Sequence, residues 1–297
     1  MIARRAAAIA VALLALAAAP ALVAQVAVFR SRVELVRVDV AVTRDGRPVT
    51  GLGAQDFDLS DNGVRQTVTH VVLEQVPVDV HMVLDTSSSL RGERLTRLQA
   101  AARRLLSGLR PGDRAALWTF SHRVSARQPL TKDLALVSNA VTSMEGQGWT
   151  ALFDVIFDVC LSPPDPERRA AAILLTDGLD TMSWLSPDHA LASAQRSPII
   201  YYVVYEPPEK TQGGRVAVEN DRFLKGLADD TDGRVWPVSA TADLAEAFSR
   251  IVEDITMRYV LLYEPTGVRG DGWHALDVHL KGGRRGDLTA RPGYFRQ

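Results

Sequence analysis

Cysteine is almost absent from this sequence of 297 residues, in which Cys160 is the only one. A single thiol cannot form an intramolecular disulfide, and so the chain has no disulfide framework. Lysine is also scarce, with Lys132, Lys210, Lys225 and Lys281 as its only representatives. The formal net charge is −1, and the arginines do not gather into a patch. Composition therefore gives no electrostatic footprint for nucleic acid or for an anionic membrane surface.

The signatures of several enzyme classes are missing as well. The sequence contains no G-x-S-x-G nucleophile elbow, no H-E-x-x-H zinc motif, no phosphate-binding glycine loop and no G-x-G-x-x-G dinucleotide motif. No histidine is placed to activate the serines at positions 87–89 as nucleophiles. Hydrophobic residues make up 46% of the chain, which is enough to bury a sizeable core.

Residues 1–27 have the pattern of an export signal. Arg4 and Arg5 precede an apolar run rich in alanine, and small residues suitable for signal peptidase follow at Ala19, Ala21 and Ala24. A retained membrane anchor is the alternative, but the run is weakly apolar for a permanent helix and contains Pro20. We expect an exported protein, either periplasmic, on the cell surface or extracellular, with no membrane insertion unless the signal stays uncleaved.

Residues 33–75 are predicted to form a small β module. Apolar and polar side chains alternate over residues 36–43, as in a half-buried strand, and Asp45-Gly46 offers a tight hairpin turn. A second hairpin turns at Asp61-Asn62-Gly63, and residues 66–73 return from it. Such short strands bury too little apolar surface to be stable alone, so that this segment needs a partner surface.

The C-terminal residues 258–297 supply three more strand-like segments, at 258–263, 273–280 and 288–295. The simplest architecture is one β module built from both ends of the chain, with the middle of the chain inserted between its halves. Terminal hairpins that lie independently on the central domain are the alternative.

Residues 77–257 alternate apolar strands with amphipathic helices. Buried strands are predicted at 78–85, 115–120, 170–175, 199–205 and 234–238, with a short edge strand at 124–130; the predicted helices cover 95–109, 133–143, 150–161, 222–229 and 242–257. Continuous apolar strands separated by helices are typical of a mostly parallel sheet that is covered on both faces. The predicted fold class is therefore α/β, a doubly wound sheet with a small β module from both termini.

Oxygen-bearing side chains stand at three places in this domain. Asp85, Ser87 and Ser89 follow the first strand, Thr150 begins a helix, and Asp177 follows the fourth strand. If the strand order is 3-2-1-4-5-6, strands one and four are neighbours at the crevice where doubly wound sheets bind ligands. Neighbouring strands are about 4.8 Å apart, so Asp85 and Asp177 can share one ion. Carboxylates and hydroxyls suit Mg²⁺ or Mn²⁺ better than zinc or copper.

Each of these residues also has an ordinary structural interpretation. Asp85 and Thr150 can cap helices, and Asp177-Gly178 can form a turn at the end of a strand. Their occurrence together, in this order and on these elements, favours a site. Asp154 and Asp180 lie nearby, and we expect the former on a polar helix face and the latter as a hydrogen-bonding loop residue.

The order Asp85-x-Ser87-x-Ser89, then Gly-x-Thr150, then Thr-Asp177-Gly, resembles the metal-ion-dependent adhesion site of von Willebrand factor type A domains. The resemblance covers residues 77–257, and the whole chain is similar to exported bacterial proteins related to this family. The family implies a Rossmann-like fold and an Mg²⁺ or Mn²⁺ ion. Ser87, Ser89 and Thr150 would hold the ion directly or through water, with Asp85 and Asp177 as carboxylates.

All five positions match the family pattern. Ser88 and Trp149 stand where the family often has glycine, and Trp149 puts an aromatic side chain beside the ion. The resemblance implies a non-enzymatic protein-binding module for adhesion or assembly. Neutral hydroxyl ligands leave the ion under-neutralised, so that an Asp or Glu carboxylate of a protein partner can complete its shell.

Two other functions stay open at this point. One is a metal-dependent hydrolase that uses the same two aspartates, although its general base cannot be named. The other is a structural envelope protein in which the site is vestigial and the β segments do the binding.

Overall fold

The computed structural model describes residues 35–45, 47–74, 76–176, 179–205, 214–238, 241–282 and 286–296. The predicted export signal, residues 1–27, lies outside the described residues, and so does Asp177. All described residues belong to one compact unit, Glu34–Gln297. In this part of the chain, no helix is both long enough and apolar enough to cross a bilayer.

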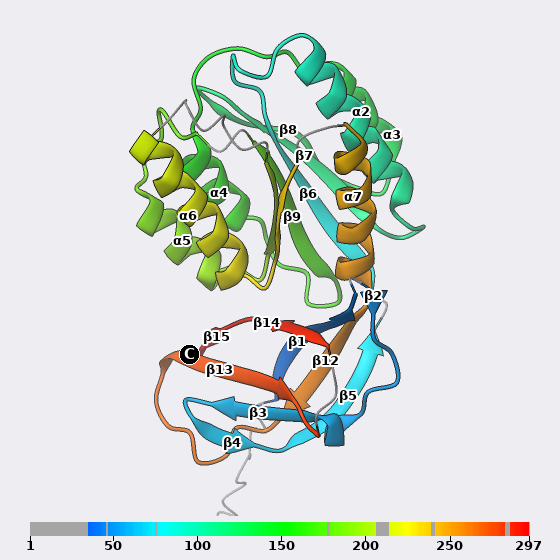
Figure 1. The fold of residues 1–297 in the computed structure, drawn as a ribbon, viewed down its shortest axis with the longest axis vertical. Coiled ribbons are helices and arrows are strands. Elements are labelled where there is room, and N and C mark those ends of the chain that lie inside the picture. Colours follow the sequence, from blue (N-terminus) through cyan, green and yellow to red (C-terminus); the bar gives the residue numbers. More distant parts are fainter. Residues whose placement is uncertain are drawn as a thin grey trace, which may run out of the picture. The chain divides into compact units, whose positions relative to one another are not determined.

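A six-stranded sheet forms the centre of the α/β domain (Figure 1). In spatial order its strands are β11 (Val235–Pro237), β10 (Ile200–Tyr205), β9 (Arg169–Thr176), β6 (Val78–Asp85), β7 (Arg114–Phe120) and β8 (Val124–Thr131). Neighbouring strands are parallel, except that β8 is antiparallel to β7. Counted along the domain, this is the predicted order 3-2-1-4-5-6, with β6 beside β9.

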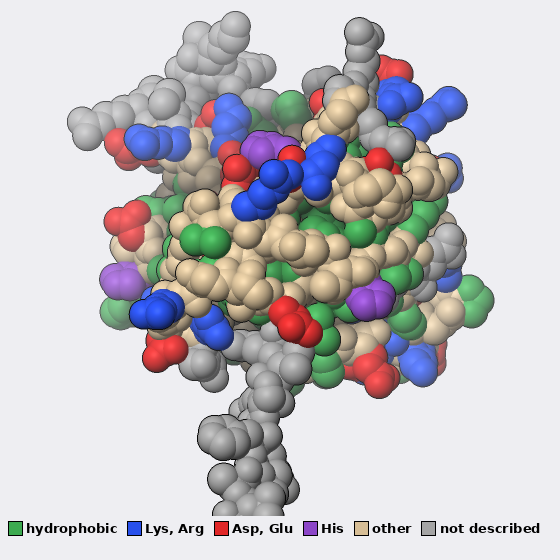
Figure 2. All heavy atoms as spheres, turned by 90° about the horizontal axis from the view of Figure 1, so that it is seen from below, with side chains coloured by type: hydrophobic (Ala, Val, Ile, Leu, Met, Phe, Trp, Pro, Cys, Tyr) green, Lys and Arg blue, Asp and Glu red, His purple; other side chains and the backbone are tan. Residues whose placement is uncertain are grey.

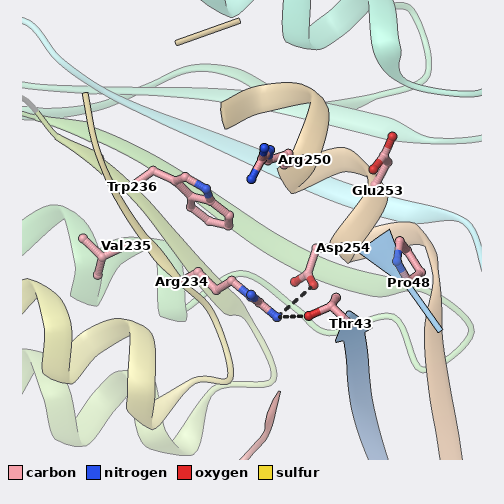
Figure 3. A pocket seen from close by; sticks show the side chains of 8 residues that line it. All are labelled: Thr43, Pro48, Arg234, Val235, Trp236, Arg250, Glu253 and Asp254. Atoms are coloured by element: carbon pink, nitrogen blue, oxygen red, sulfur yellow. Dashed lines mark hydrogen bonds and ion pairs between the residues drawn. The ribbon is translucent and has the colours of Figure 1, made fainter. Parts of the chain in front are cut away.

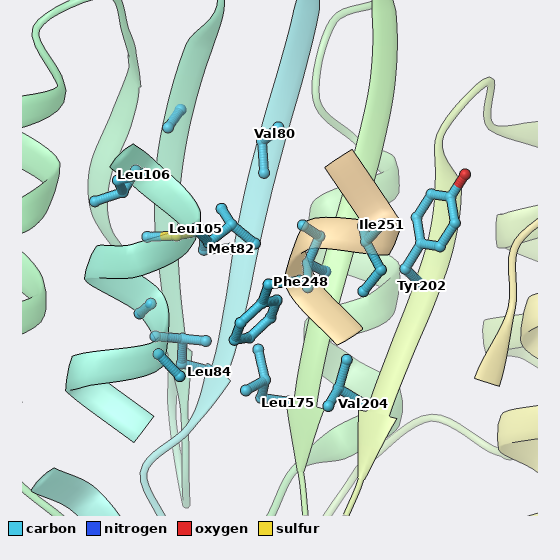
Figure 4. Close-up of a cluster of buried hydrophobic side chains, with 14 of the residues drawn as sticks. Val80, Met82, Leu84, Leu105, Leu106, Leu175, Tyr202, Val204, Phe248 and Ile251 are labelled. Atoms are coloured by element: carbon cyan, nitrogen blue, oxygen red, sulfur yellow. The ribbon is translucent and has the colours of Figure 1, made fainter. Parts of the chain in front are cut away.

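Helices cover both faces of this sheet (Figure 1). On one face lie α2 (Glu93–Gly108), α3 (Leu134–Thr142) and α7 (Thr241–Thr256), and on the other α4 (Leu152–Cys160), α5 (Pro187–Arg196) and α6 (Gly214–Asp230). Side chains of a strand alternate between the two faces, so that Val80, Met82 and Leu84 of β6 pack against α2 and α7 (Figure 4), while Val83 packs on the opposite side. The predicted doubly wound α/β fold class is confirmed.

Two helices differ from the prediction. Helix α5 was not predicted, although Ser186 accepts a hydrogen bond from the backbone N–H of His189 and Pro187 occupies the first turn. Serine at the cap followed by proline is a helix-start signal that could have revealed it. Helix α6 begins at Gly214 and is therefore longer than the predicted segment 222–229.

Strands from both ends of the chain interleave in the β module (Figure 1). One sheet has the order β14 (Asp287–Ala290), β1 (Val36–Arg44), β12 (Arg258–Tyr263) and β5 (Val68–Glu74), with β2 (Arg47–Pro48) paired to β1. The other has the order β15 (Gly293–Arg296), β13 (Gly272–Leu280), β3 (Phe57–Asp61) and β4 (Val64–Gln66), and the 3₁₀ helix η1 (Ala54–Asp56) precedes β3.

The antiparallel pairing of β1 with β12, and of β3 with β13, joins strands from the N-terminal segment directly to strands from the C-terminal segment. Both ends of the chain thus contribute to one β module, as the predicted fold class states. Val40, Phe57, Tyr259 and Leu261 belong to its buried core. The segment 288–295, predicted as one strand, is two strands in two sheets. Arg291 and Pro292 separate them, because proline has no N–H to continue the pairing.

One face of the molecule is seen in Figure 2, at a right angle to the view of Figure 1. Charged side chains of both signs are interspersed over the described residues on this face, without one large area of lysine and arginine. This distribution agrees with the near-zero net charge of the sequence.

Candidate metal centre

Asp85 is the last residue of β6, and its side chain is fully buried. Its Oδ1 accepts a hydrogen bond of 2.8 Å from the backbone N–H of Ser87, and its Oδ2 accepts one of 2.9 Å from the hydroxyl of Thr176. Thr176 ends β9, the parallel neighbour of β6. The sheet therefore brings together the carboxyl ends of two strands that are far apart in the sequence.

Ser87 and Ser89 continue this array toward the surface. Their hydroxyl oxygens are 2.9 Å apart; Ser87 is buried and Ser89 is exposed. Adjacent oxygen ligands of an octahedral Mg²⁺, each at about 2.1 Å from the ion, are about 3 Å apart. The same separation is that of an ordinary hydroxyl hydrogen bond. The donor chemistry and spacing of these residues thus fit a hard divalent cation.

Thr150 is buried and lies two residues before α4, on a loop that is fastened to the loop of Ser87 and Ser89. The backbone N–H of Ser88 donates to the carbonyl of Gly148 at 3.0 Å, and Gln147 donates to Thr86 at 2.7 Å. These two hydrogen bonds hold the segment before Thr150 against the segment after Asp85.

Gly148 is required in this loop for two reasons. Its φ of +84° lies in the left-handed region, which side chains with a Cβ rarely adopt. In addition, a Cβ atom at this position would lie 2.3 Å from Nδ1 of His122. The Gly-x-Thr pattern therefore has a steric basis here, independent of any bound ion.

The loop after β9 holds Thr150 from the other side. The backbone N–H groups of Thr181 and Met182 donate to the carbonyl of Thr150 at 2.9 and 3.0 Å, and the N–H of Thr150 donates to the hydroxyl of Thr181 at 2.9 Å. Oδ1 of Asp180 accepts from the N–H of Leu152 at 2.8 Å, which confirms its predicted part as a hydrogen-bonding loop residue. Backbone and side chains thus lock this loop to the start of α4.

The structure brings Asp85, Ser87 and Ser89 together by direct hydrogen bonds and places Thr150 on a loop bonded to theirs. Asp177 lies outside the described residues, so the complete set of five stays a prediction. Thr176 is the contributor that the sequence analysis did not assign. Thr176 belongs to the Thr-Asp177-Gly pattern, but its contact with Asp85 spans 91 positions, and no local spacing predicts that contact.

Within the described ranges, no three His, Cys, Asp or Glu side chains are grouped as metal ligands. The candidate ligands at Asp85 are instead one carboxylate and neighbouring hydroxyl groups.

A separate hollow of about 200 Å³ is shown in Figure 3. Arg234 donates to the hydroxyl of Thr43 at 3.4 Å and lies 3.8 Å from the carboxylate of Asp254, while Arg250 pairs with Glu246 at 2.6 Å. Both guanidinium groups already contact oxygen atoms of the protein. This hollow is therefore a weaker candidate for a binding site than the loops after β6 and β9.

Comparisons with known proteins agree with this architecture. Residues 80–179 match the family model described as the von Willebrand factor type A domain, a segment that extends from β6 to just beyond β9. One similar solved structure is proximal thread matrix protein 1 from the mussel byssus with a zinc-occupied MIDAS motif. It is 19% identical with a TM-score of 0.51, over 64% of this chain and 48% of that chain.

Two bacterial structures are also similar. The conserved hypothetical protein BatB from Bacteroides thetaiotaomicron is 20% identical over 60% of this chain and 98% of its own, with a TM-score of 0.49. A von Willebrand factor type A protein from Catenulispora acidiphila is 15% identical over 90% and 76%, also with a TM-score of 0.49. A search of curated proteins found no match.

The family match, the sheet order and the three loops together define an α/β domain with a candidate ligand site at the carboxyl ends of its strands. Residues 80–179, which match the von Willebrand factor type A domain model, form the centre of this α/β domain.

Proposed function

We propose that this protein is a non-enzymatic module for adhesion or assembly that binds another protein through a divalent cation. The residues that would hold the ion are Asp85, Ser87, Ser89, Thr150 and Asp177. The main support is the row of side chains from Asp85 to Ser89. The buried carboxylate of Asp85 is oriented by hydrogen bonds to both of its oxygens, and it is followed by the buried hydroxyl of Ser87 and the exposed Ser89.

The donor set explains why such a site would bind a partner. Hydroxyl ligands carry no charge, so the bound ion would keep part of its positive charge and attract an outside carboxylate. Because Ser89 is exposed while Asp85 is buried, a partner has access to the hydroxyl side of the array and not to the carboxylate. An Asp or Glu side chain of another protein is the ligand that fits this chemistry.

Calorimetric titration with Mg²⁺ and Mn²⁺ tests the cation site. Zn²⁺ belongs in the same series, because one similar structure is described with a zinc-occupied site. We expect wild type to bind a cation and Asp85→Ala to lose more than about 100-fold in affinity, since removal of groups that merely orient a ligand already costs 10 to 100-fold.

Asp277→Ala is the matched control, because Asp277 is exposed on β13 of the β module. It should bind the cation as wild type does. Unchanged binding by Asp85→Ala, in a variant with the far-ultraviolet circular dichroism of wild type, would contradict the assigned site.

Partner binding is tested by a pull-down from an envelope fraction with and without EDTA. A partner should be retained with the cation, released by EDTA and absent from Asp85→Ala.

A hydrolysis screen with saturating Mn²⁺ addresses the alternative function. Activity that disappears in Asp85→Ala would favour a metal-dependent hydrolase over a binding module.

We also propose that residues 1–27 direct export and that residues 77–257 form the cation-binding domain, flanked by the β module of residues 33–75 and 258–297. N-terminal sequencing of the protein from cell fractions tests the first part. A new N-terminus near Ala19, Ala21 or Ala24 is expected, whereas an intact N-terminus in the membrane fraction would favour an anchor.

A further inference from the structure

Three large apolar side chains are exposed on the loops of the candidate metal centre. They are Trp149, Met182 and Trp184, with 66%, 45% and 95% of their surface accessible. We refer to these three residues as the apolar rim. Trp149 directly precedes Thr150, and the backbone N–H of Met182 donates to the carbonyl of Thr150 at 3.0 Å. The apolar rim therefore belongs to the same loops as the proposed ion ligands.

The backbone that carries the apolar rim is tightly held. The N–H of Trp184 donates to both carboxylate oxygens of Asp154 at 3.1 Å, so Asp154 orders this loop as well as occupying the first turn of α4. The hydroxyl of Ser183 accepts from the N–H of Phe153 at 2.9 Å. These contacts fix the main chain at the start of α4, and the tryptophans point to solvent from a preorganised support.

Exposed tryptophan is unusual, because its large apolar surface is normally well covered. Another exposed aromatic pair of this chain, Trp273 and Phe295, is partly covered by its own edge-to-face contact at 5.1 Å. Apolar side chains gathered on one surface mark an interaction site, and tryptophan is among the residues that contribute most to binding energy.

We infer that the apolar rim binds a large apolar side chain adjacent to the docking carboxylate, so that the partner presents Asp or Glu next to an aromatic or long aliphatic residue. This inference rests on the proposed function. A cation distinguishes poorly between one carboxylate and another, whereas a desolvated contact with tryptophan selects for the neighbouring residue. The continuity of the apolar rim with a cation site favours a protein segment of this composition over an anionic lipid surface, to which the net charge of −1 gives no attraction.

An array of immobilised pentapeptides, Gly-X-Glu-Z-Gly with X and Z varied, tests the inference with the full-length protein in saturating Mg²⁺ and in EDTA. With Mg²⁺, peptides in which X or Z is Phe, Tyr, Trp or Leu should bind about tenfold more tightly than Gly-Gly-Glu-Gly-Gly, which corresponds to one moderate hot-spot contact. Replacement of Glu by Gln in the best peptide should abolish the binding that depends on Mg²⁺.

Trp149→Ala and Trp184→Ala should each reduce the preference for the apolar neighbour about tenfold, while Mg²⁺ affinity measured by calorimetry stays at the wild-type value. Leu161→Ala is the matched control. Leu161 is 65% exposed but lies at the opposite end of α4, and its truncation should leave peptide binding unchanged.

The outcomes separate this inference from the proposed function. Mg²⁺-dependent binding of Glu peptides with no influence of X or Z would overturn the apolar-rim inference and leave the proposed function standing. Equal binding of all Glu peptides in Mg²⁺ and EDTA would overturn both. Co-sedimentation with phosphatidylglycerol vesicles that is lost in Trp184→Ala would assign the apolar rim to a membrane and contradict the peptide proposal.

Discussion

The hydroxyl of Thr176 donates a hydrogen bond of 2.9 Å to Oδ2 of Asp85. The contact joins the carboxyl ends of β9 and β6, and the other carboxylate oxygen accepts from the backbone of Ser87. Both oxygens of Asp85 are thus oriented by the protein itself. In metal sites, outer-shell hydrogen bonds of this kind orient a ligand for the ion, and this is the part that we propose for Thr176.

Thr176→Val should weaken Mg²⁺ binding about 10 to 100-fold, because valine has the shape of threonine but cannot orient Asp85. Calorimetry measures the change. Thr86→Val is the matched control, since the hydroxyl of Thr86 donates to the carbonyl of Phe120 and not to Asp85. It should cost about 1 kcal/mol of stability and leave Mg²⁺ affinity unchanged. Equal Mg²⁺ affinities of the two variants would count against the orienting role.

Gly148→Ala should destabilise the protein more than Gly112→Ala. Both glycines have positive φ, +84° and +100°, so each substitution costs about 1–2 kcal/mol in backbone strain. Only Gly148 would also clash with His122, because no atom lies within 4 Å of a Cβ at Gly112. Urea unfolding measures both variants.

A second substitution separates the clash of Gly148→Ala from its backbone strain. Adding His122→Ala should recover the part of the loss that exceeds the cost of Gly112→Ala. If the double variant unfolds at the same urea concentration as Gly148→Ala, steric contact with His122 is not the cause.

The β module should lose stability as the pH rises, because His274 then loses its stabilising proton. His274 is buried, its Nδ1 is 2.8 Å from Oδ1 of Asp61, and its Nε2 is 3.0 Å from the carbonyl of Gly270. Burial disfavours the charged imidazole, but the Gly270 carbonyl and the Asp61 carboxylate outweigh it and raise the pKa of His274 above its ordinary value. Both partners are acceptors, and so the doubly protonated ring fits the site best.

The sign of the pH effect follows from this raised pKa. The stabilisation by His274 is complete below the unfolded pKa of about 6.5 and is lost as the pH rises through the higher folded value. Urea unfolding at a series of pH values, followed by tryptophan fluorescence, should show this loss in wild type and not in His274→Gln. His279→Gln is the control, because His279 is exposed on the same strand. A pH dependence retained in His274→Gln would refute the assignment.

Arg258→Met should destabilise the protein by about 3–5 kcal/mol, the usual cost of leaving buried charges without a partner. Arg258 is fully buried, forms ion pairs with Asp232 and Asp254, and donates to the hydroxyl of Tyr202 at 3.1 Å. Burial raises the pKa of Asp232 to about 6. The positive charge of Arg258 acts to lower this pKa, and the negative charge of Asp254 acts to raise it. Removal of the arginine would take the ion pair from Asp232 and leave Asp254 with its 3.8 Å contact to Arg234.

The matched control for Arg258→Met is Arg250→Met. Arg250 is exposed and pairs with Glu246, one helical turn away, and such an exposed pair contributes less than about 1 kcal/mol. Asp232→Asn added to Arg258→Met should restore part of the stability. Similar free energies of unfolding for the two single variants would show that the buried pairs contribute little.

Much of the fold could be predicted from the chain, because its signals are local. The continuous apolar run of residues 170–175 in β9 and the helical spacing of apolar residues in α2 predict a covered parallel sheet. Local patterns are misleading where tertiary context decides the structure. Residues 288–295 look like one strand, yet Pro292 lies between strands of two different sheets.

The sequence by itself determined the type and order of the candidate oxygen ligands, from Asp85 at the end of β6 to Thr150 before α4, and with them the expectation of a cation site. Only the tertiary structure decided that Thr176 orients Asp85, that Gly148 packs on His122, and that the tryptophans of the apolar rim are left exposed beside these loops. The physical reason is the separation along the sequence of the residues that interact. Strand and helix patterns arise between residues a few positions apart, whereas these contacts join loops that meet only when parallel strands align.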